Sequence, residues 1–130
     1  KDVAFHWFLS DVDFRYTEGN ITYYPINQKL FNESLISCDG IITGGGFETP
    51  AEALYLGKKI LSIPIQNHYE QECNAEAMKK LGIKVLKKID NNFGDHFKSW
   101  INQDNSVKIS LTHSTNDIVE VLMNNAFTHA

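Results

Sequence analysis

The sequence predicts an α/β domain in which a mostly parallel sheet is packed between layers of helices. Apolar runs of four to seven residues recur along the chain, and several are nearly continuous, which is typical of buried parallel strands. Segments with helical periodicity lie between most of these runs, so strands and helices alternate. A chain of 130 residues suits one domain with one core. Right-handed crossovers would bring the strand-to-helix loops to the carboxyl edge of the sheet, where open α/β sheets bind ligands.

The apolar runs define the expected strands, and the periodic segments define the expected helices. Strands are expected at Val3–Leu9, Ile21–Ile26, Gly40–Thr43, Ile60–Ile65 and Ile83–Leu86. Helices are expected at Leu30–Cys38, from Thr49 onward, at Glu70–Leu81, at Phe93–Gln103 and at Thr115–Phe127. The third of these begins with glutamates, carries lysines in its last turn and stops at Gly82, in accord with the helix dipole and with glycine as a left-handed terminator.

The overall charge and the two cysteines exclude several classes of protein. The formal net charge is −4, so no global basic field would hold nucleic acid or an anionic membrane. No apolar run approaches the roughly 20 residues of a membrane span. Cys38 and Cys73 have neither zinc-site nor disulfide spacing, which favours a reducing, cytoplasmic setting. Because Lys1 lies almost on a strand, the chain is expected to be a fragment of a longer protein.

Three consecutive glycines, Gly44–Gly46, join the strand at Gly40–Thr43 to a helix. Thr49 suits the N-cap of that helix, and Pro50 suits its first helical position. Because the loop carries little side chain, a ligand could approach its backbone, and unused N–H groups at the positive helix end would face that ligand. The loop therefore fits a phosphate, although a tight turn selected only for packing accounts for the glycines equally well.

Glu52 also has two interpretations. The run from Thr49 to Glu52 fits a capping box, in which the carboxylate bonds back to the Thr49 backbone. Alternatively, the carboxylate accepts hydrogen bonds from the two hydroxyls of a ribose, because it offers two acceptor oxygens. The local sequence alone favours the capping box.

Polar side chains follow the strand at Ile60–Ile65, at the same predicted edge. Pro64 ends this strand, Glu70 and Gln71 begin the next helix, and Asn74 shares a helix face with Gln71. Carboxylate and amide groups are suited to sugar hydroxyls, although an ordinary polar helix start accounts for Glu70 by itself.

Taken together, residues 44–82 resemble the donor-binding signature of GT-B glycosyltransferases; they read GGGFETPAEALYLGKKILSIPIQNHYEQECNAEAMKKLG. The signature is shared by the GlcNAc transferase that forms lipid II and by UDP-glucuronosyltransferases, and the chain is also similar to teichoic-acid-biosynthesis-related glycosyltransferases. The resemblance implies a Rossmann-like, three-layer domain that forms the carboxyl-terminal half of a two-domain enzyme. Residues 1–130 would be its nucleotide-sugar donor-binding domain. Lys59 stands where family members usually carry proline, which implies only the loss of a preset turn.

The resemblance implies a role for each matching position. The diphosphate would be held by the glycine turn and the helix start, at Gly44, Gly45, Gly46, Phe47 and Thr49. Glu52 would bind the ribose hydroxyls, a role that here outweighs the capping box. Glu70, Gln71 and Asn74 would hold the donor sugar, with Asn74 also supporting the loop. Ile26 falls where backbone groups contact the base, usually uracil.

The resemblance also implies the reaction. An acceptor hydroxyl would attack the anomeric carbon of a UDP-hexose or similar donor, and the nucleoside diphosphate would leave. The base would come from an amino-terminal acceptor domain, so no catalytic residue is assigned and the chain alone should bind without catalysing. No metal and no cofactor is implied. The product would be a cell-envelope or teichoic-acid-like glycan, made in the cytoplasm at the inner face of the membrane.

Two other functions are considered. The chain could be the soluble donor-binding subunit of a two-chain transferase that docks to a membrane-bound acceptor subunit. A Rossmann-type oxidoreductase is disfavoured, because its glycine motif would need a glycine at Thr49 and its strand at Ile60–Ile65 would need to end near an acidic residue instead of Gln66.

Metal binding is weakly indicated at two places. Asp11 and Asp13 form a short D-x-D motif, a spacing that is common by chance. His68, Glu72 and Cys73 lack the spacing of established metal motifs, which favours a solvated loop and helix start.

Overall fold

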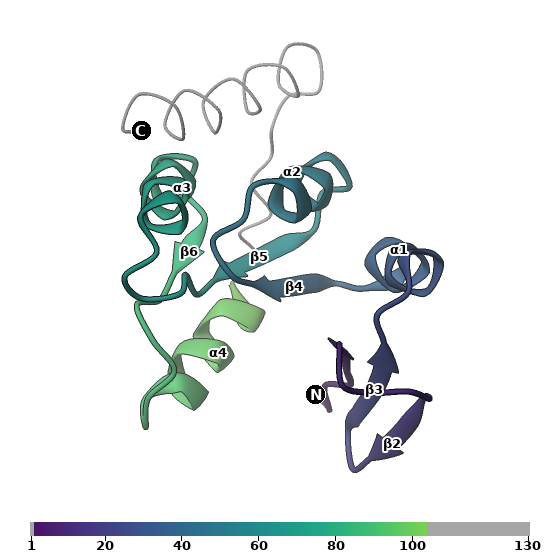
Figure 1. Cartoon of the computed structure of the whole chain (residues 1–130). Helices are drawn as coiled ribbons and strands as arrows, with labels where there is room; N and C mark the ends of the chain where they lie inside the picture. The colour runs from purple at the N-terminus through teal and green to yellow at the C-terminus, as the bar shows by residue number, and fades with distance from the viewer. Residues whose placement is uncertain (1, 104–130) are drawn as a thin grey trace. The chain divides into compact units, whose positions relative to one another are not determined.

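The computed structural model describes residues 2–103, and over this range the chain divides into two compact units. The first unit ends at Cys38 and the second begins at Asp39. Each unit contains its own three-stranded sheet (Figure 1). The helix predicted at Thr115–Phe127 lies outside the described residues.

The first unit consists of three strands followed by a helix: β1 (Phe5–Leu9), β2 (Tyr16–Glu18), β3 (Ile21–Pro25) and α1 (Gln28–Ser37). β1 pairs in parallel with β3, and β2 pairs antiparallel with β3 on its other side. The antiparallel strand β2 was not predicted. Its three residues are all exposed, so they form no apolar run, and its hairpin depends on Gly19, which adopts a φ of 59°.

α1 covers one face of the first sheet. The ring of Phe31 meets that of Phe8 edge to face, with centroids 5.3 Å apart. His6 Nδ1 and Ser34 Oγ share a hydrogen bond of 2.7 Å, so His6 packs against the helix. Side chains alternate between the two faces of a strand, so Trp7, between His6 and Phe8, lies on the face away from α1. On that face the ring of Tyr23 stacks with those of Trp7 and Tyr16.

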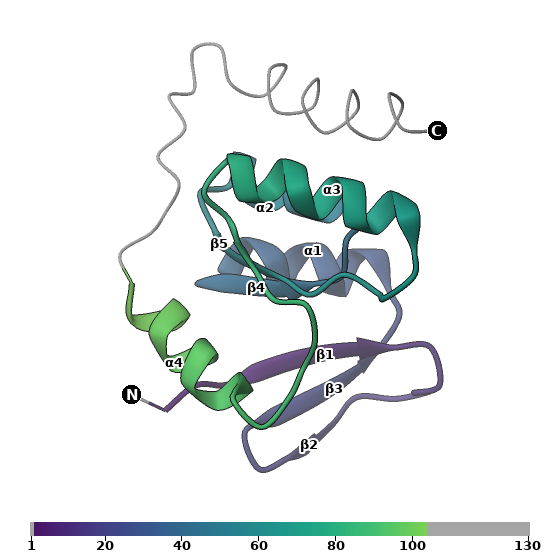
Figure 2. The same ribbon diagram turned by 90° about the vertical axis from the view of Figure 1, so that its left-hand side faces the viewer.

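The second unit has three layers. Its wholly parallel sheet follows the order β4-β5-β6, with β4 at Gly40–Thr43, β5 at Lys59–Ser62 and β6 at Lys84–Val85. α2 (Glu48–Tyr55) and α3 (Tyr69–Lys80) lie on one face of this sheet, and α4 (Phe93–Asn102) lies on the other (Figure 2). The predicted α/β, Rossmann-like fold is therefore confirmed, and β4 has the bounds expected from the sequence.

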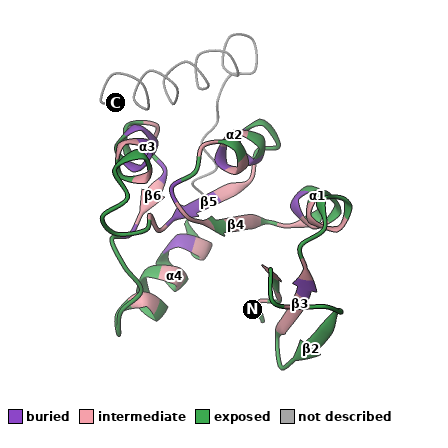
Figure 3. Cartoon of the chain, in the orientation of Figure 1, coloured by how far each residue is buried: buried purple, intermediate pink, exposed green. Residues whose placement is uncertain are grey.

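β5 is the centre of the second unit's core. Leu61 is fully buried and clusters with Leu86 and Trp100 on the side of α4. Figure 3 shows buried residues on β5 and on the inner sides of α2 and α3. β5 is shorter than the predicted Ile60–Ile65 because Pro64 has no N–H to donate to a neighbouring strand.

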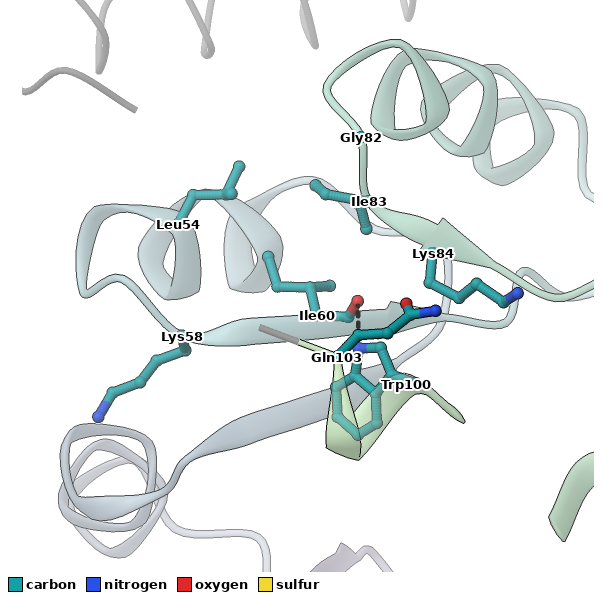
Figure 4. Close-up of a pocket in the computed structure, with 8 residues that line it drawn as sticks. All are labelled: Leu54, Lys58, Ile60, Gly82, Ile83, Lys84, Trp100 and Gln103. Atoms are coloured by element: carbon teal, nitrogen blue, oxygen red, sulfur yellow. Dashed lines mark hydrogen bonds between the residues drawn. The ribbon is translucent and has the colours of Figure 1, made fainter. Parts of the chain in front are cut away.

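Trp100 attaches α4 to the sheet. Its indole Nε1 donates a hydrogen bond of 3.1 Å to the carbonyl of Ile60 (Figure 4). Gly40 leaves room for the ring, since a Cβ at this position would lie 3.0 Å from both Trp100 Cη2 and the Lys59 carbonyl. The pocket drawn in Figure 4, which Trp100, Ile60 and Ile83 help to line, lies at the amino ends of β5 and β6. It is thus at the opposite edge of the sheet from the strand-to-helix loops.

Lys59 has a structural role that the sequence did not indicate. Its Nζ donates hydrogen bonds of 2.8 Å to the Ile101 carbonyl and 2.5 Å to the Gln103 carbonyl, at the end of α4. A cation at this end of a helix satisfies terminal carbonyls and complements the helix dipole. Lys59 therefore stabilises the end of α4, which the resemblance did not imply.

We expect Lys59→Met to lower the free energy of unfolding by about 1 kcal/mol, because it keeps the aliphatic stem but removes the charge from the end of α4. Urea denaturation followed by circular dichroism measures this change. Lys98→Met, on the exposed surface of α4, is the matched control and should change stability by less than about 0.5 kcal/mol. Equal losses in the two variants would show that the Lys59 contacts add nothing.

Candidate functional site

The glycine loop lies where the sequence placed it, between the carboxyl end of β4 and the start of α2. Gly45 is buried, Gly46 is exposed and Gly44 is intermediate. A Cβ on Gly45 would lie 2.7 Å from both the Cα and the carbonyl oxygen of Gln71, a separation that real Cβ atoms do not show. A Cβ on Gly46 would meet nothing within 4 Å. Gly45 is thus required by close packing against α3, whereas Gly46 has open space beside it.

α2 begins earlier than predicted. Its N-cap is Phe47, whose backbone is already helical and whose side chain makes no capping hydrogen bond. Thr49 is therefore inside the first turn, and the expectation that it is the N-cap is wrong, as is the placement of Pro50 at the first helical position. Proline is tolerated here because the first-turn N–H groups have no partner within a helix.

The early start of α2 leaves its first backbone donors unused. Within the described residues, no hydrogen bond takes the N–H groups of Gly46, Phe47, Glu48 or Thr49. Unpaired N–H groups and the positive end of the helix dipole together favour an anion.

The same shift removes the capping-box interpretation of Glu52. A capping box needs the glutamate three residues after the N-cap, and Phe47 is the N-cap. Glu52 lies in the second turn of α2 with an exposed side chain, and its carboxylate makes no hydrogen bond or ion pair within residues 2–103. The carboxylate is therefore available to a ligand.

Gln71 connects the glycine loop to the loop that follows β5. Its Oε1 accepts a hydrogen bond of 3.0 Å from the Gly45 N–H and one of 2.8 Å from the Ile65 N–H. α3 presents this side chain at its start, where His68 Nδ1 caps the Gln71 N–H at 3.3 Å. Since the amide oxygen is engaged by two backbone donors, only the Nε2 group of Gln71 remains for a ligand.

Asn74 is fully buried against the same loop. Its Nδ2 donates a hydrogen bond of 2.8 Å to the Gly45 carbonyl. Its Oδ1 is buried without a partner among the described residues. Asn74 therefore acts on the backbone of the glycine loop.

A further residue at the loop, Ser62, was not identified from the sequence. This last residue of β5 is fully buried, and its Oγ donates a hydrogen bond of 3.0 Å to the Gly44 carbonyl. The available signal was a single hydroxyl in the apolar run KILSIPI, since a buried polar side chain needs a partner.

Two predicted ligand residues stand apart from this network. Glu70 is exposed in the first turn of α3, where its charge complements the helix dipole. Beside it, partial desolvation raises the pKa of Tyr69, and a hydrogen bond with Cys73 raises it further. Ile26 belongs to the first unit, where its side chain is 70% exposed just after β3.

The metal alternatives gain no support from the geometry. In residues 2–103, no group of three His, Cys, Asp or Glu side chains gathers as a metal site would require. Asp11 and Asp13 are exposed in the loop between β1 and β2.

Among the described helices, none is long and apolar enough to cross a membrane.

A parallel strand, a glycine loop and an uncapped helix start, in this order, define a Rossmann-like domain with its loop at the carboxyl edge of the sheet. The chain belongs to glycosyl transferase family 1, because the model of that family matches residues 4–102. Membership supports a function in glycosyl transfer. No curated protein and no solved structure matches the chain significantly.

Proposed function

We propose that residues 1–130 are the donor-binding domain of a glycosyltransferase that moves a hexosyl group from a nucleotide-diphosphate sugar, a UDP-sugar, to an acceptor hydroxyl. The observation that carries this proposal is the row of unused N–H groups from Gly46 to Thr49 at the uncapped start of α2. Such donors would hold the diphosphate, and membership of glycosyl transferase family 1 supports a sugar nucleotide as its source.

The loop would also assist the leaving group. As an acceptor hydroxyl attacks the anomeric carbon, negative charge develops on the departing diphosphate. Backbone N–H groups and the dipole of α2, already oriented toward that charge, would stabilise it more in the transition state than in the ground state. No residue of this chain is assigned as the base, which a second, acceptor-binding domain would supply.

The remaining groups would recognise the rest of the donor. Glu52 would accept hydrogen bonds from the ribose hydroxyls, and Glu70 and the Nε2 group of Gln71 would bind sugar hydroxyls. The resemblance to lipid II-forming and teichoic-acid-related enzymes supports synthesis of a cell-envelope glycan in the cytoplasm, at the inner face of the membrane.

Calorimetric titration of the full chain tests the proposal. UDP, ADP, GDP, TDP and NAD are titrated, each with magnesium and with EDTA. Binding of UDP that survives EDTA is the expected result. Binding only with magnesium would instead favour a metal-dependent diphosphate site at Asp11 and Asp13. Preference for NAD would favour an oxidoreductase.

We expect Glu52→Ala to lower the affinity for UDP by about 10- to 100-fold, the cost of losing hydrogen bonds from two hydroxyls to a carboxylate. Stability should change by less than about 0.5 kcal/mol, because the side chain has no hydrogen bond or ion pair within residues 2–103. Glu48→Ala, one turn earlier on α2, is the matched control. It removes a negative charge near the expected diphosphate, so its UDP affinity should be unchanged or higher. Equal losses in both variants would contradict the ribose role.

A further inference from the structure

We propose that Ser62 is a positioning residue of the donor site. Together with Gln71 and Asn74, it fixes two consecutive peptide planes of the glycine loop, so that the Gly46 N–H points out of the protein toward a bound diphosphate. This inference rests on the proposed function, and it assigns to the end of β5 a role in that site.

The first peptide plane is held at both ends. The Gly44 carbonyl and the Gly45 N–H belong to one peptide unit, and they point in opposite directions because the described chain has no cis peptide bond. Ser62 Oγ donates to the carbonyl at 3.0 Å, and Gln71 Oε1 accepts from the N–H at 3.0 Å. With both ends bonded, this peptide cannot rotate without breaking one of the two hydrogen bonds.

The second peptide plane is oriented by Asn74. The Gly45 carbonyl and the Gly46 N–H form the next peptide unit, and the carbonyl accepts from Asn74 Nδ2 at 2.8 Å. Asn74 is fully buried, so the carbonyl points inward and the trans N–H on the same plane points away from α3. Gly46 is exposed, and no atom of the described residues lies within 4 Å of where its Cβ would stand, so the loop is not crowded at this residue.

Such anchoring is needed because glycine is the most flexible residue, and three in succession could otherwise adopt many conformations. A site whose donors already point at the ligand avoids the cost of ordering them on binding. Ser62 lies on the central strand of a packed sheet, so its hydroxyl is a rigid support. Loss of the hydroxyl would leave the first peptide bonded only to Gln71, so its plane could tilt and, through Gly45, change the direction of the second.

Ser62→Ala in the full chain tests the inference, with UDP, uridine and inorganic diphosphate as separate calorimetric probes. We expect the variant to bind UDP and diphosphate about tenfold more weakly and to bind uridine as well as the wild type does, because only the phosphates meet the glycine loop. Ser62→Thr keeps the hydroxyl and should restore most of the UDP affinity. Ser37→Ala is the matched control, since its hydroxyl also donates to a backbone carbonyl, that of Ser34 at 3.1 Å, but in α1.

The outcomes separate the two proposals. Equal losses for UDP and uridine, or no loss for UDP, would overturn the positioning role of Ser62 while leaving the donor site intact. A wild-type chain that binds neither UDP nor diphosphate would overturn the proposed function itself. If Ser62→Ala is too unstable for titration, Ser62→Cys fills the site with a slightly larger group that is a weaker donor, and it should also weaken binding of UDP and diphosphate without weakening binding of uridine.

Discussion

Gly45→Ala should lower the free energy of unfolding by about 3 kcal/mol and abolish UDP binding at concentrations that saturate the wild type. The added methyl group would lie 2.7 Å from the Gln71 backbone, so either the loop or the start of α3 must move. Backbone cannot yield as a flexible side chain can. Either movement would break the hydrogen bonds that Gln71 and Asn74 make to Gly45. Denaturant unfolding and calorimetry measure the two effects.

Gly46→Ala is the matched control for this prediction. Its methyl group meets no atom of the described part of the chain within 4 Å, so stability should change by less than about 0.5 kcal/mol. UDP affinity should nevertheless fall by about tenfold, because the methyl group occupies the side from which the diphosphate would approach. A Gly45→Ala protein that is stable and still binds UDP would contradict the packing described for the loop. Wild-type affinity in Gly46→Ala would show that the diphosphate does not bind beside Gly46.

Trp100→Ala should lower the free energy of unfolding by about 3–5 kcal/mol. The indole packs with Leu61 and Leu86 and donates to the buried Ile60 carbonyl, so its removal leaves a cavity and one hydrogen bond fewer. Gly40, which makes space for the ring, cannot fill that cavity. Urea denaturation followed by circular dichroism would report a lower midpoint.

The second tryptophan of the chain provides the control for Trp100. Trp7 is 52% exposed on the sheet of the first unit, and its main contact is a stacked ring, that of Tyr23, 5.9 Å away. Trp7→Ala should therefore cost about 1 kcal/mol or less. If the two variants lost equal stability, α4 would not be an integral part of the core of the second unit.

Much of the fold was predictable because its signals are local. Continuous apolar runs predicted β4 to the residue and placed β1, β3, β5 and β6 within a few residues of their observed ends. The charges of α3 and its end before Gly82, which adopts a φ of 82°, were also predicted. β2 was missed, because a three-residue exposed strand owes its existence to pairing with β3 and not to its own composition.

The start of α2 shows where local rules failed. Thr49 and Pro50 match the preferences of an N-cap and a first helical residue, yet the helix begins at Glu48. Hydrogen bonds from Ser62 of β5 and Gln71 of α3 fix the glycine loop that precedes the helix. With the loop fixed in this way, Phe47 already has helical backbone angles. Tertiary contacts thus outweighed a capping preference worth about 1 kcal/mol.

The sequence by itself determined the order of the elements, the position of the glycine loop at the carboxyl edge of a parallel sheet, and the residue types that suit a sugar nucleotide. Only the tertiary structure decided how that loop is held. Its hydrogen bonds to Ser62, Gln71 and Asn74 join residues 18, 26 and 29 positions apart, and no periodicity or motif encodes such pairs. They form because parallel strands bring the end of β5 beside the end of β4, and because the crossover to α3 places two amides against the same glycines. Burial then favours a partner for these polar groups, and the backbone of the loop provides one for the Ser62 hydroxyl and one for the Asn74 Nδ2 group.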